Sequence, residues 1–293
     1  MNINESSILS EFDKLVNSGI VQYNDQQETI DYVDGDLKFQ FCLTTALIKK
    51  PTLQSKSEKE HDEQRRDGSD ISTVGFEIGE INGTHVLIAN KFCYARPHLM
   101  LVTSDGHQRQ YEALDLNDLS SAWLIISTMD RDYVGFFNCG QDGGCSRLHK
   151  HLQFIPTPQN LFASFLDSND PEPKVPFHWF YRRLDAQTTP ETLLKIYTEL
   201  LEQSTKIWEG CTTHNAAVSP NAACPHNFII TKRWVVVLPR QRAAINGEAG
   251  VNAIGMLGYI VVSTQKEIDN WIRIGLTDSL KVVGVPKWEV CKQ

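Results

Sequence analysis

The sequence lacks any apolar run near the roughly 18 residues that would suggest a membrane-spanning helix. Residues 1–12 are acidic and polar where a signal peptide would be basic and then apolar, so we expect a cytoplasmic protein. Positive charge is also scarce, with 28 Lys and Arg against 36 Asp and Glu and a formal net charge of -8. This balance repels phosphodiester backbones and anionic lipid. We therefore expect no nucleic-acid or membrane partner, although one basic pocket for a small anion remains compatible.

Closely spaced cysteine pairs are absent as well. The seven cysteines form an odd set without a CxxC spacing, which is typical of free thiols in a reducing compartment. A zinc site assembled from distant Cys and His residues stays open at this stage, but no local motif nominates one. We predict no metal held by the protein itself.

Strand-like segments dominate the middle of the chain of 293 residues. Apolar alternation predicts strands over 84–92, 98–103, 133–138 and 151–156, with a helix over 117–129 between the second and third. Further helices are predicted near the N-terminus around Ile8 and Phe12, over 189–210 with Thr189 as its cap, and over 264–275. Two short strands are predicted within 227–240. Residues 55–70 carry charges of both signs and no apolar side chain, so they predict a mobile surface loop.

The segment 140–156, GQDGGCSRLHKHLQFIP, combines a glycine-rich turn with alternating polar side chains. If its second half is a strand, the period of two places His149, His151 and Gln153 on one face. Leu152 and Phe154 then lie on the opposite face and give it a reason to be buried. An exposed polar face on an edge strand would give the same pattern, so the motif alone leaves both interpretations open.

The glycines in front of the histidines favour an anion site over an ordinary tight turn. Gly140, Gly143 and Gly144 permit positive φ angles and close backbone approach, so successive N–H groups can converge on phosphate oxygens. Further polar donors flank them: Asn138, Gln141, Ser146 and Arg147. A phosphate cradle would then lie directly beside an imidazole.

This combination predicts nucleotidyl transfer. Neutral imidazole is a competent phosphorus nucleophile near pH 7, and a phosphoramidate intermediate is labile enough to be passed to an acceptor. Glutamine at position 153 can donate a hydrogen bond to a phosphoryl oxygen but cannot protonate a leaving group. A polyphosphate, already a good leaving group, does not require that proton.

The motif HKHLQ with its glycine-rich approach resembles the histidine-triad superfamily, specifically the transferase branch with Gln at the third triad position. Within that branch the chain resembles the fungal diadenosine tetraphosphate phosphorylases, or ATP adenylyltransferases. The resemblance covers most of the chain: LIKKP (47–51), ANKF and HLMLVT in 89–103, HNFIITKRWVVVLPR (226–240) and NAIGMLGYIVV (252–262) match family segments in order.

The resemblance implies an α+β fold with a histidine-triad-like central antiparallel sheet and covering helices. It implies one catalytic domain, 1–293, in which 1–160 carries the HxHxQ strand and 161–293 completes the sheet and the nucleotide site. The implied reaction is phosphorolysis of a dinucleoside tetraphosphate to ADP and ATP, and its reverse, with a divalent cation such as Mg²⁺ accompanying the polyphosphate. Small nucleotides and phosphate are the partners, and the protein is a monomer or a dimer.

By the same resemblance, His151 attacks an α-phosphate and holds AMP covalently, Gln153 contacts the transferred phosphate, and His149 supports the nucleophile. The implied nucleotide-binding residues are Lys50, Asn90, Lys91, Asn138, Gly144, Cys145, Ser146 and Arg147, with Asn252, Ala253, Ile254 and Tyr259 closing the site. Two positions depart from the family pattern. Cys145 replaces a small Ala or Ser, which could make the site oxidisable, and Ser263, with Lys266 nearby, stands where a basic residue is expected.

Two other functions fit the same motif. A hexose-1-phosphate nucleotidylyltransferase uses the same HxHxQ logic on UDP-sugars, and a non-catalytic nucleotide sensor could retain the fold. The remaining histidines, including His98 and His226, are expected to be structural or exposed. The residues do not decide nucleobase preference, reaction direction or use of adenylyl sulfate.

Overall fold

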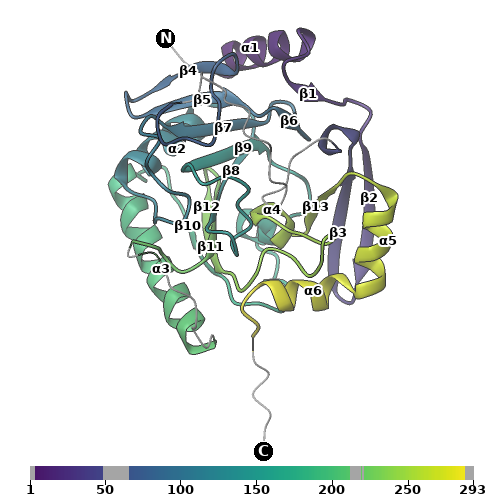
Figure 1. Ribbon diagram of the computed structural model, residues 1–293. Helices are drawn as coiled ribbons and strands as arrows, with labels where there is room; N and C mark the ends of the chain where they lie inside the picture. Colours follow the sequence, from purple (N-terminus) through teal and green to yellow (C-terminus); the bar gives the residue numbers. More distant parts are fainter. Residues whose placement is uncertain (1–3, 49–65, 212–218, 220, 288–293) are drawn as a thin grey trace, which may run out of the picture.

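An eight-stranded antiparallel sheet forms the centre of the protein (Figure 1). The computed structural model describes residues 4–48, 66–211, 219 and 221–287. The sheet order is β10-β12-β11-β8-β9-β7-β5-β4. The strands are β4 (Glu77–Ile81), β5 (His85–Ala89), β7 (Leu99–Thr103), β8 (Tyr133–Cys139), β9 (His151–Pro156), β10 (Phe180–Arg183), β11 (His226–Ile230) and β12 (Trp234–Pro239). The predicted α+β class and central antiparallel sheet are confirmed.

The strand with the HxHxQ motif lies in the middle of this sheet. On one side β9 pairs with β7, where Val102 faces His151, and on the other side it pairs with β8, where Phe136 faces Gln153. The edge-strand interpretation of the motif is therefore wrong. Because β9 is a central strand, exposure to solvent at a sheet edge does not explain its polar side chains. A functional site explains them better.

Helices cover one face of the sheet. Helices α2 (Leu116–Thr128) and α3 (Pro190–Cys211) lie against this face, and α1 (Glu5–Asn17) lies at the β4 end (Figure 1). Leu152 and Phe154 of β9 belong to the same buried apolar cluster as Leu119 of α2 and Leu193 of α3. The predicted burial of this side of β9 is confirmed, so His151 and Gln153 face the opposite way.

A second, three-stranded sheet covers the other face. It contains β2 (Glu28–Asp34), β3 (Leu37–Leu43) and β13 (Tyr259–Val262), with β3 in the middle and β13 parallel to it. Helices α5 (Gln265–Ile274) and α6 (Leu276–Val283) pack beside it (Figure 1). Of the C-terminal strands, β10 to β12 extend the main sheet, whereas β13 pairs with β3 from the N-terminal part. The positive φ of 95° at Gly258 turns the chain toward β3, whose Gln40 N–H donates to the Gly258 carbonyl.

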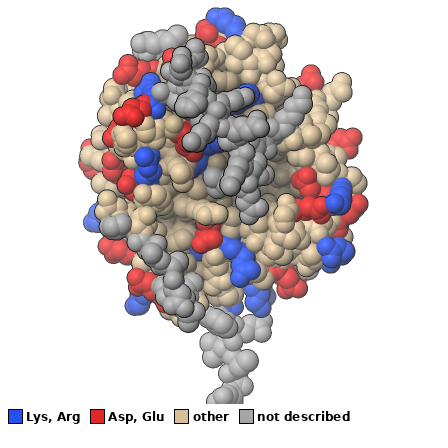
Figure 2. Space-filling model, viewed as in Figure 1, with Lys and Arg blue, Asp and Glu red and all other residues tan. Residues whose placement is uncertain are grey.

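Short elements connect the two sheets. The helix α4 (Ala253–Met256) precedes β13, and β1 (Gln22–Tyr23) forms a two-stranded parallel pair with β6 (Phe92–Cys93). Two 3-10 helices, η1 (Thr45–Leu47) and η2 (Phe162–Asp167), follow β3 and β9. No helix in the described part of the chain is long and apolar enough to span a membrane. Acidic and basic side chains are interspersed over the face in Figure 2, without a continuous basic surface on its described residues.

Candidate active site

His151 is the first residue of β9, and a backbone carbonyl fixes the orientation of its ring. The Nδ1 atom lies 2.8 Å from the backbone oxygen of His149, which can only accept a hydrogen bond. In the neutral ring, the Nδ1 atom therefore carries the proton and the lone pair resides on Nε2. With 3% of its surface exposed, the imidazole is in a desolvated position, and this tautomer presents a nucleophilic nitrogen on the side of the ring away from the backbone.

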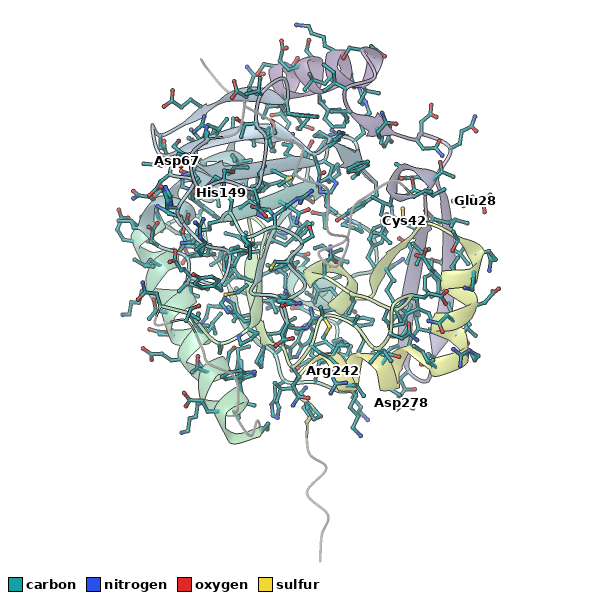
Figure 3. All side chains as sticks on the ribbon, in the orientation of Figure 1. Glu28, Cys42, Asp67, His149, Arg242 and Asp278 are labelled. Carbon is teal, nitrogen blue, oxygen red and sulfur yellow. The ribbon has the colours of Figure 1, made fainter. Side chains whose placement is uncertain are left out.

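The ring of His149, which is labelled in Figure 3, is held by hydrogen bonds at both of its nitrogens. Its Nε2 lies 2.8 Å from the Thr103 hydroxyl and 3.0 Å from the Asp105 carbonyl, so Nε2–H donates there. Its Nδ1 then accepts from the Ser69 hydroxyl at 2.7 Å. Burial lowers the pKa of His149, which keeps the ring neutral at pH 7. The ring thus fixes the backbone carbonyl that orients His151, and this geometry fits the supporting role predicted for His149.

Residues 66–70 contact His149 and the residues beside it. Both carboxylate oxygens of Asp70 accept backbone hydrogen bonds, from Leu148 N at 2.8 Å and from His149 N at 2.9 Å. Arg66 donates to the Ser104 carbonyl at 3.3 Å. Of the loop predicted over 55–70, residues 55–65 lie outside the described residues, as does Lys50. Its described end, 66–70, is a wall of the site, which sequence reasoning missed.

Gln153 contacts a histidine that was not predicted for the site. The Nε2 atom of His98 lies 3.0 Å from Gln153 Oε1 and 3.2 Å from Asn90 Nδ2. His98 is 1% exposed, so this contact takes place in the interior. The predicted residues Asn90 and Gln153 are therefore brought together through His98. Lys91, by contrast, is exposed, and its ammonium lies 5.8 Å from the Phe92 ring.

The glycine-rich turn approaches the C-terminal part too closely for side chains. A Cβ atom on Gly144, whose φ is 89°, would lie 3.0 Å from the Val251 oxygen, and one on Gly143 would lie 2.1 Å from the Cys139 oxygen. Gly140 also has a positive φ, of 72°. The predicted need for glycine is supported at these three positions. Ser146 and Arg147 follow the turn in half-buried positions.

A buried polar network holds this turn against the start of α4. Asn138 Oδ1 accepts from Asn227 Nδ2 at 3.0 Å and from the backbone N–H of Ala253, the first residue of α4, at 2.9 Å. Asn227 Nδ2 also donates to the Gly143 oxygen at 2.7 Å. The carboxamide oxygen of Asn138 thus serves the architecture of the site. Ala253 and Ile254 are fully buried, so both form the support of the site.

Arg240 is the charged member of the same network. Its fully buried guanidinium donates to Asn227 Oδ1 at 2.7 Å, to the Val251 oxygen at 3.0 Å and to the Val283 oxygen at 3.2 Å. Burial lowers the pKa of Arg240 to about 9. This side chain, which directly follows β12, therefore ties together β11, α6 and the segment before α4.

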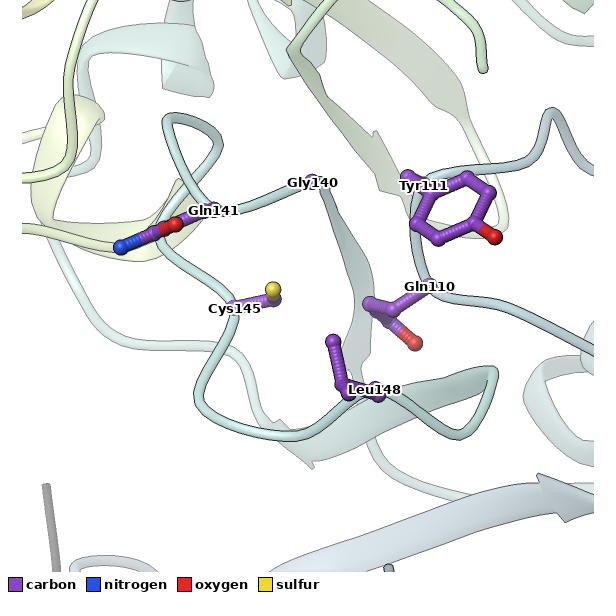
Figure 4. A pocket seen from close by; sticks show the side chains of 6 residues that line it. All are labelled: Gln110, Tyr111, Gly140, Gln141, Cys145 and Leu148. Carbon is purple, nitrogen blue, oxygen red and sulfur yellow. The ribbon is translucent and has the colours of Figure 1, made fainter. Parts of the chain in front are cut away.

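Two cavities meet at Cys145. The smaller has a volume of about 310 Å³, and across it the side chains of Cys145 and Gln110 point toward one another (Figure 4). The larger has a volume of about 350 Å³ and is lined by Leu47, Tyr94, Gly144, Cys145, Ala243, Ala244, Gly250, Val251, Asn252, Gly255, Ile260 and Val261. Burial raises the pKa of the Cys145 thiol to about 11, which disfavours the reactive thiolate.

The larger cavity is linked to β9 by Tyr94. The Tyr94 ring packs edge-on against His98, with 4.5 Å between ring centroids, and His98 in turn contacts Gln153. Of the predicted closing residues, Asn252 lines the cavity and caps α4 through Gly255 N. Tyr259 is half-buried on β13 and packs against the core beside the cavity.

The region after β13 shows a second departure from the family pattern. Lys266 forms an ion pair with Glu248, and the Ser263 N–H donates to Glu267 at 3.0 Å. The nearest lysine to Ser263 in sequence is thus engaged with a carboxylate. Among the residues that the structure describes, no group of three or more His, Cys, Asp or Glu side chains is placed to hold a metal ion.

Two known protein-family models match most of the chain. Residues 10–166 match the Ap4A phosphorylase N-terminal domain, and residues 173–286 match the ATP adenylyltransferase C-terminal domain. The chain belongs to the Ap4A phosphorylase family. The first match alone covers more than half of the chain, and the predicted family resemblance is confirmed.

Two yeast proteins are similar over most of the chain. Diadenosine 5',5'''-P1,P4-tetraphosphate phosphorylase 2 of Saccharomyces cerevisiae is 26% identical over 267 residues, which are 81% of this chain and 80% of the relative. Protein APA1 of the same yeast is 27% identical, over 82% of this chain and 81% of the relative.

Solved structures share the fold. The crystal structure of yeast Ap4A phosphorylase Apa2 aligns with a TM-score of 0.75 and 22% identity, over 98% of this chain and 99% of that one. Apa2 in complex with Ap4A aligns with a TM-score of 0.74 and 21% identity, over 98% and 99% of the two chains. The chain therefore aligns with the Apa2 fold over nearly the whole length of both chains.

Proposed function

We infer that this protein is a nucleotidyltransferase that cleaves dinucleoside tetraphosphates with inorganic phosphate to give ADP and ATP, and that it catalyses the reverse reaction. The observation that carries this proposal is His151. Its Nδ1–H is committed to the His149 carbonyl at 2.8 Å, so its lone pair is on Nε2, at the start of a central strand beside a glycine-rich turn. The names of the yeast relatives support the substrate class.

The reaction divides into two transfers. Nε2 of His151 attacks an α-phosphorus, a P–N bond forms, the P–O bond to the leaving ATP breaks, and the electron pair leaves with ATP. An oxygen of inorganic phosphate then attacks the same phosphorus, the P–N bond breaks, and ADP is released with the lone pair restored to Nε2. The first leaving group is a polyphosphate, so the reaction does not require a proton from residue 153.

The surrounding groups fit polar recognition of a phosphoryl centre. We assign Gln153 to the transferred phosphate, because its amide lies two residues from His151 on the same face of β9. Gly143 would bring its backbone N–H to the phosphate oxygens, while the Gly144 N–H donates within the turn to the Gln141 oxygen at 2.9 Å. Mg²⁺ would reach the site with the polyphosphate as part of the substrate, because it neutralises those oxygens.

The cavities on both sides of Cys145 suit the nucleoside parts of the substrate. Each holds about 300 Å³ or slightly more, which is at the small end of ordinary ligand pockets. We assign Asn252 and Gly144, which line the larger cavity, to nucleotide binding, while Asn90 acts through His98. Contacts of Lys50, Lys91, Ser146 and Arg147 with the polyphosphate remain predictions from the family resemblance.

A trapping experiment tests the proposal. The protein is mixed with diadenosine tetraphosphate without phosphate, and intact-protein mass spectrometry should show an increment equal to one AMP residue. Adding phosphate should discharge that increment as ADP. Turnover that ignores phosphate, or adenylylation that persists in His151→Ala, would contradict the proposal. Exchange between UDP-glucose and galactose 1-phosphate would instead indicate the hexose-1-phosphate reaction.

We also propose a cytoplasmic location. Four buried cysteines, Cys42, Cys139, Cys145 and Cys224, are free thiols, as is usual in a reducing compartment. Fluorescence microscopy of the tagged full-length protein in its host cell would test this location.

A further inference from the structure

The side chain of Gln110 holds the backbone of His151 by both of its polar groups. Gln110 Oε1 accepts from His151 N at 2.7 Å, and Gln110 Nε2 donates to the His151 carbonyl at 3.0 Å. The same Nε2 donates to the Asn138 carbonyl on β8 at 3.1 Å. Gln110 is 1% exposed, so all three hydrogen bonds form in the protein interior.

This arrangement occurs where the two central strands separate. The register of β8 with β9 runs from Tyr133–Pro156 to Phe136–Gln153 and ends there. Beyond that point, residues 108–110 enter between the strands: Gln110 N donates to the Leu148 oxygen at 2.8 Å, and Gly140 N donates to the Gln110 oxygen at 3.0 Å. The carboxamide of Gln110 supplies the partners that β8 would otherwise provide to His151.

The separation of the strands leaves a cavity beside Gln110, the residue that bonds to the His151 backbone. Gln110 itself lines the smaller cavity, opposite Cys145 (Figure 4). If β8 paired with β9 to its end, backbone atoms would fill this region. The amide of Gln110 therefore lets the sheet open beside His151 without leaving buried backbone groups unsatisfied.

We propose that Gln110 is the positioning residue of the nucleophile: its carboxamide fixes the His151 backbone, while the His149 carbonyl fixes the ring. This inference rests on the proposed function, because it assumes that His151 Nε2 attacks phosphorus. Attack requires an in-line approach, and a displacement of about 1 Å in a reacting group can lower a rate about 100-fold. A residue that only filled the interior would change stability without separating chemistry from binding.

Single-turnover kinetics test the proposal. Gln110→Met has a similar volume and removes all three hydrogen bonds, and we expect adenylylation of the protein by diadenosine tetraphosphate without phosphate to slow about 100-fold. AMP affinity, measured by calorimetry, should change less than about threefold, because the carboxamide of Gln110 bonds to the backbone of His151 and Asn138, and Met keeps a side chain of similar size at the smaller cavity. Gln110→Glu retains the acceptor for His151 N–H and loses both donors. If the Met variant fails to fold, Gln110→Glu is measured in its place, and we expect its adenylylation to be at least about tenfold slower than that of the wild-type protein.

A remote variant controls for lost stability. Leu200 is buried on α3, so Leu200→Ala should lower the melting temperature and leave the adenylylation rate within about twofold. Adenylylation of both Gln110 variants at the wild-type rate would overturn the inference, as would parallel losses of rate and AMP affinity. Failure of the wild-type protein to become adenylylated would overturn the proposed function instead, so the two failures are distinguishable.

Discussion

Two histidines begin the strands on either side of β8 in the central sheet, with the same local geometry but on opposite faces. His151 begins β9 and His226 begins β11, and β8 lies between these strands. In each case Nδ1 lies 2.8 Å from the carbonyl oxygen two residues earlier, which belongs to His149 or to Cys224. Both rings therefore carry their lone pair on Nε2, so the local backbone motif does not distinguish a nucleophile from a structural histidine.

The face of the sheet makes the difference. His226 points into the helical layer, where its Nε2 lies 3.1 Å from the Tyr197 hydroxyl of α3 and its ring packs near Phe137. The phenol hydroxyl thus occupies the lone pair that could otherwise attack a substrate. His151 points to the other face, toward the glycine-rich turn. The comparison shows that the face of the sheet, which the alternation of side chains along a strand determines, separates the proposed nucleophile from the structural histidine.

The largest difference between the two histidines is expected in turnover. His151→Asn should lower phosphorolysis of diadenosine tetraphosphate at least about 1,000-fold, because the attacking nitrogen is lost. His226→Asn should change turnover less than about threefold and destabilise the fold by about 2–3 kcal/mol through lost buried hydrogen bonds. Steady-state kinetics and urea unfolding measure both effects. Equal losses of turnover in the two variants would remove the distinction.

The second expected effect is a loss of folding stability in acid that arises from the buried ring of His226. Burial lowers the pKa of His226 to about 4, whereas the unfolded chain takes up this proton near an ordinary histidine pKa. The unfolded state therefore binds more protons between these values, and folding stability falls as the pH drops through about 6.5. Near pH 4 the loss from this residue amounts to about 3 kcal/mol.

The variant His226→Asn checks this sign. Its unfolding free energy should be lower than that of the wild-type protein at pH 7.5, and the gap should narrow toward pH 4.5. His149, whose pKa is also lowered by burial, adds loss of the same sign to both proteins and does not affect the gap. A gap that stays constant over this range would contradict the assignment of a neutral buried His226.

Much of the fold was predictable where periodicity was strong. The strand β9 has the predicted bounds 151–156, and α2 lies within one residue of its prediction at each end. The strands β4 and β10 were missed because their sequences, EIGEI and FYRR, carry weak alternation at the edges of the sheet. The strand β2 was also missed, although Ile30 and Tyr32 alternate with polar neighbours and gave a usable signal.

The site was predictable only where it is local in sequence. The glycine turn and HxHxQ are contiguous, so their spacing revealed them. Gln110, Ser69 and His98 reach the motif from 41, 80 and 55 residues away, and glutamine, serine or histidine at such separations carries no local pattern. Tertiary folding alone brings them together. The family resemblance did not supply them either, because Gln110 and Ser69 lie outside the matching segments, and His98, which begins the matching segment HLMLVT, was expected to be structural or exposed.

Removing the hydroxyl that occupies the His226 lone pair should affect stability alone. Tyr197→Phe deletes the bond to His226 Nε2 and leaves the Leu114 N–H, which now donates to that hydroxyl at 3.1 Å, without its acceptor. We expect a destabilisation of about 1–3 kcal/mol by urea unfolding and turnover within about twofold of the wild-type value. A large fall in turnover would mean that the helical face also contributes to the chemistry.

The matching deletion on the His151 side should have the smallest effect on stability and a measurable one on rate. Ser69→Ala removes the hydroxyl 2.7 Å from His149 Nδ1, and through His149 it loosens the carbonyl that orients His151. We expect about 1 kcal/mol of destabilisation and a three- to tenfold lower kcat at unchanged KM. The pair Ser69→Ala and Tyr197→Phe removes one hydroxyl from a histidine ring in each case. If Tyr197→Phe lowered kcat more than Ser69→Ala did, the orientation of His151 would not depend on the hydrogen bonds that hold the His149 ring.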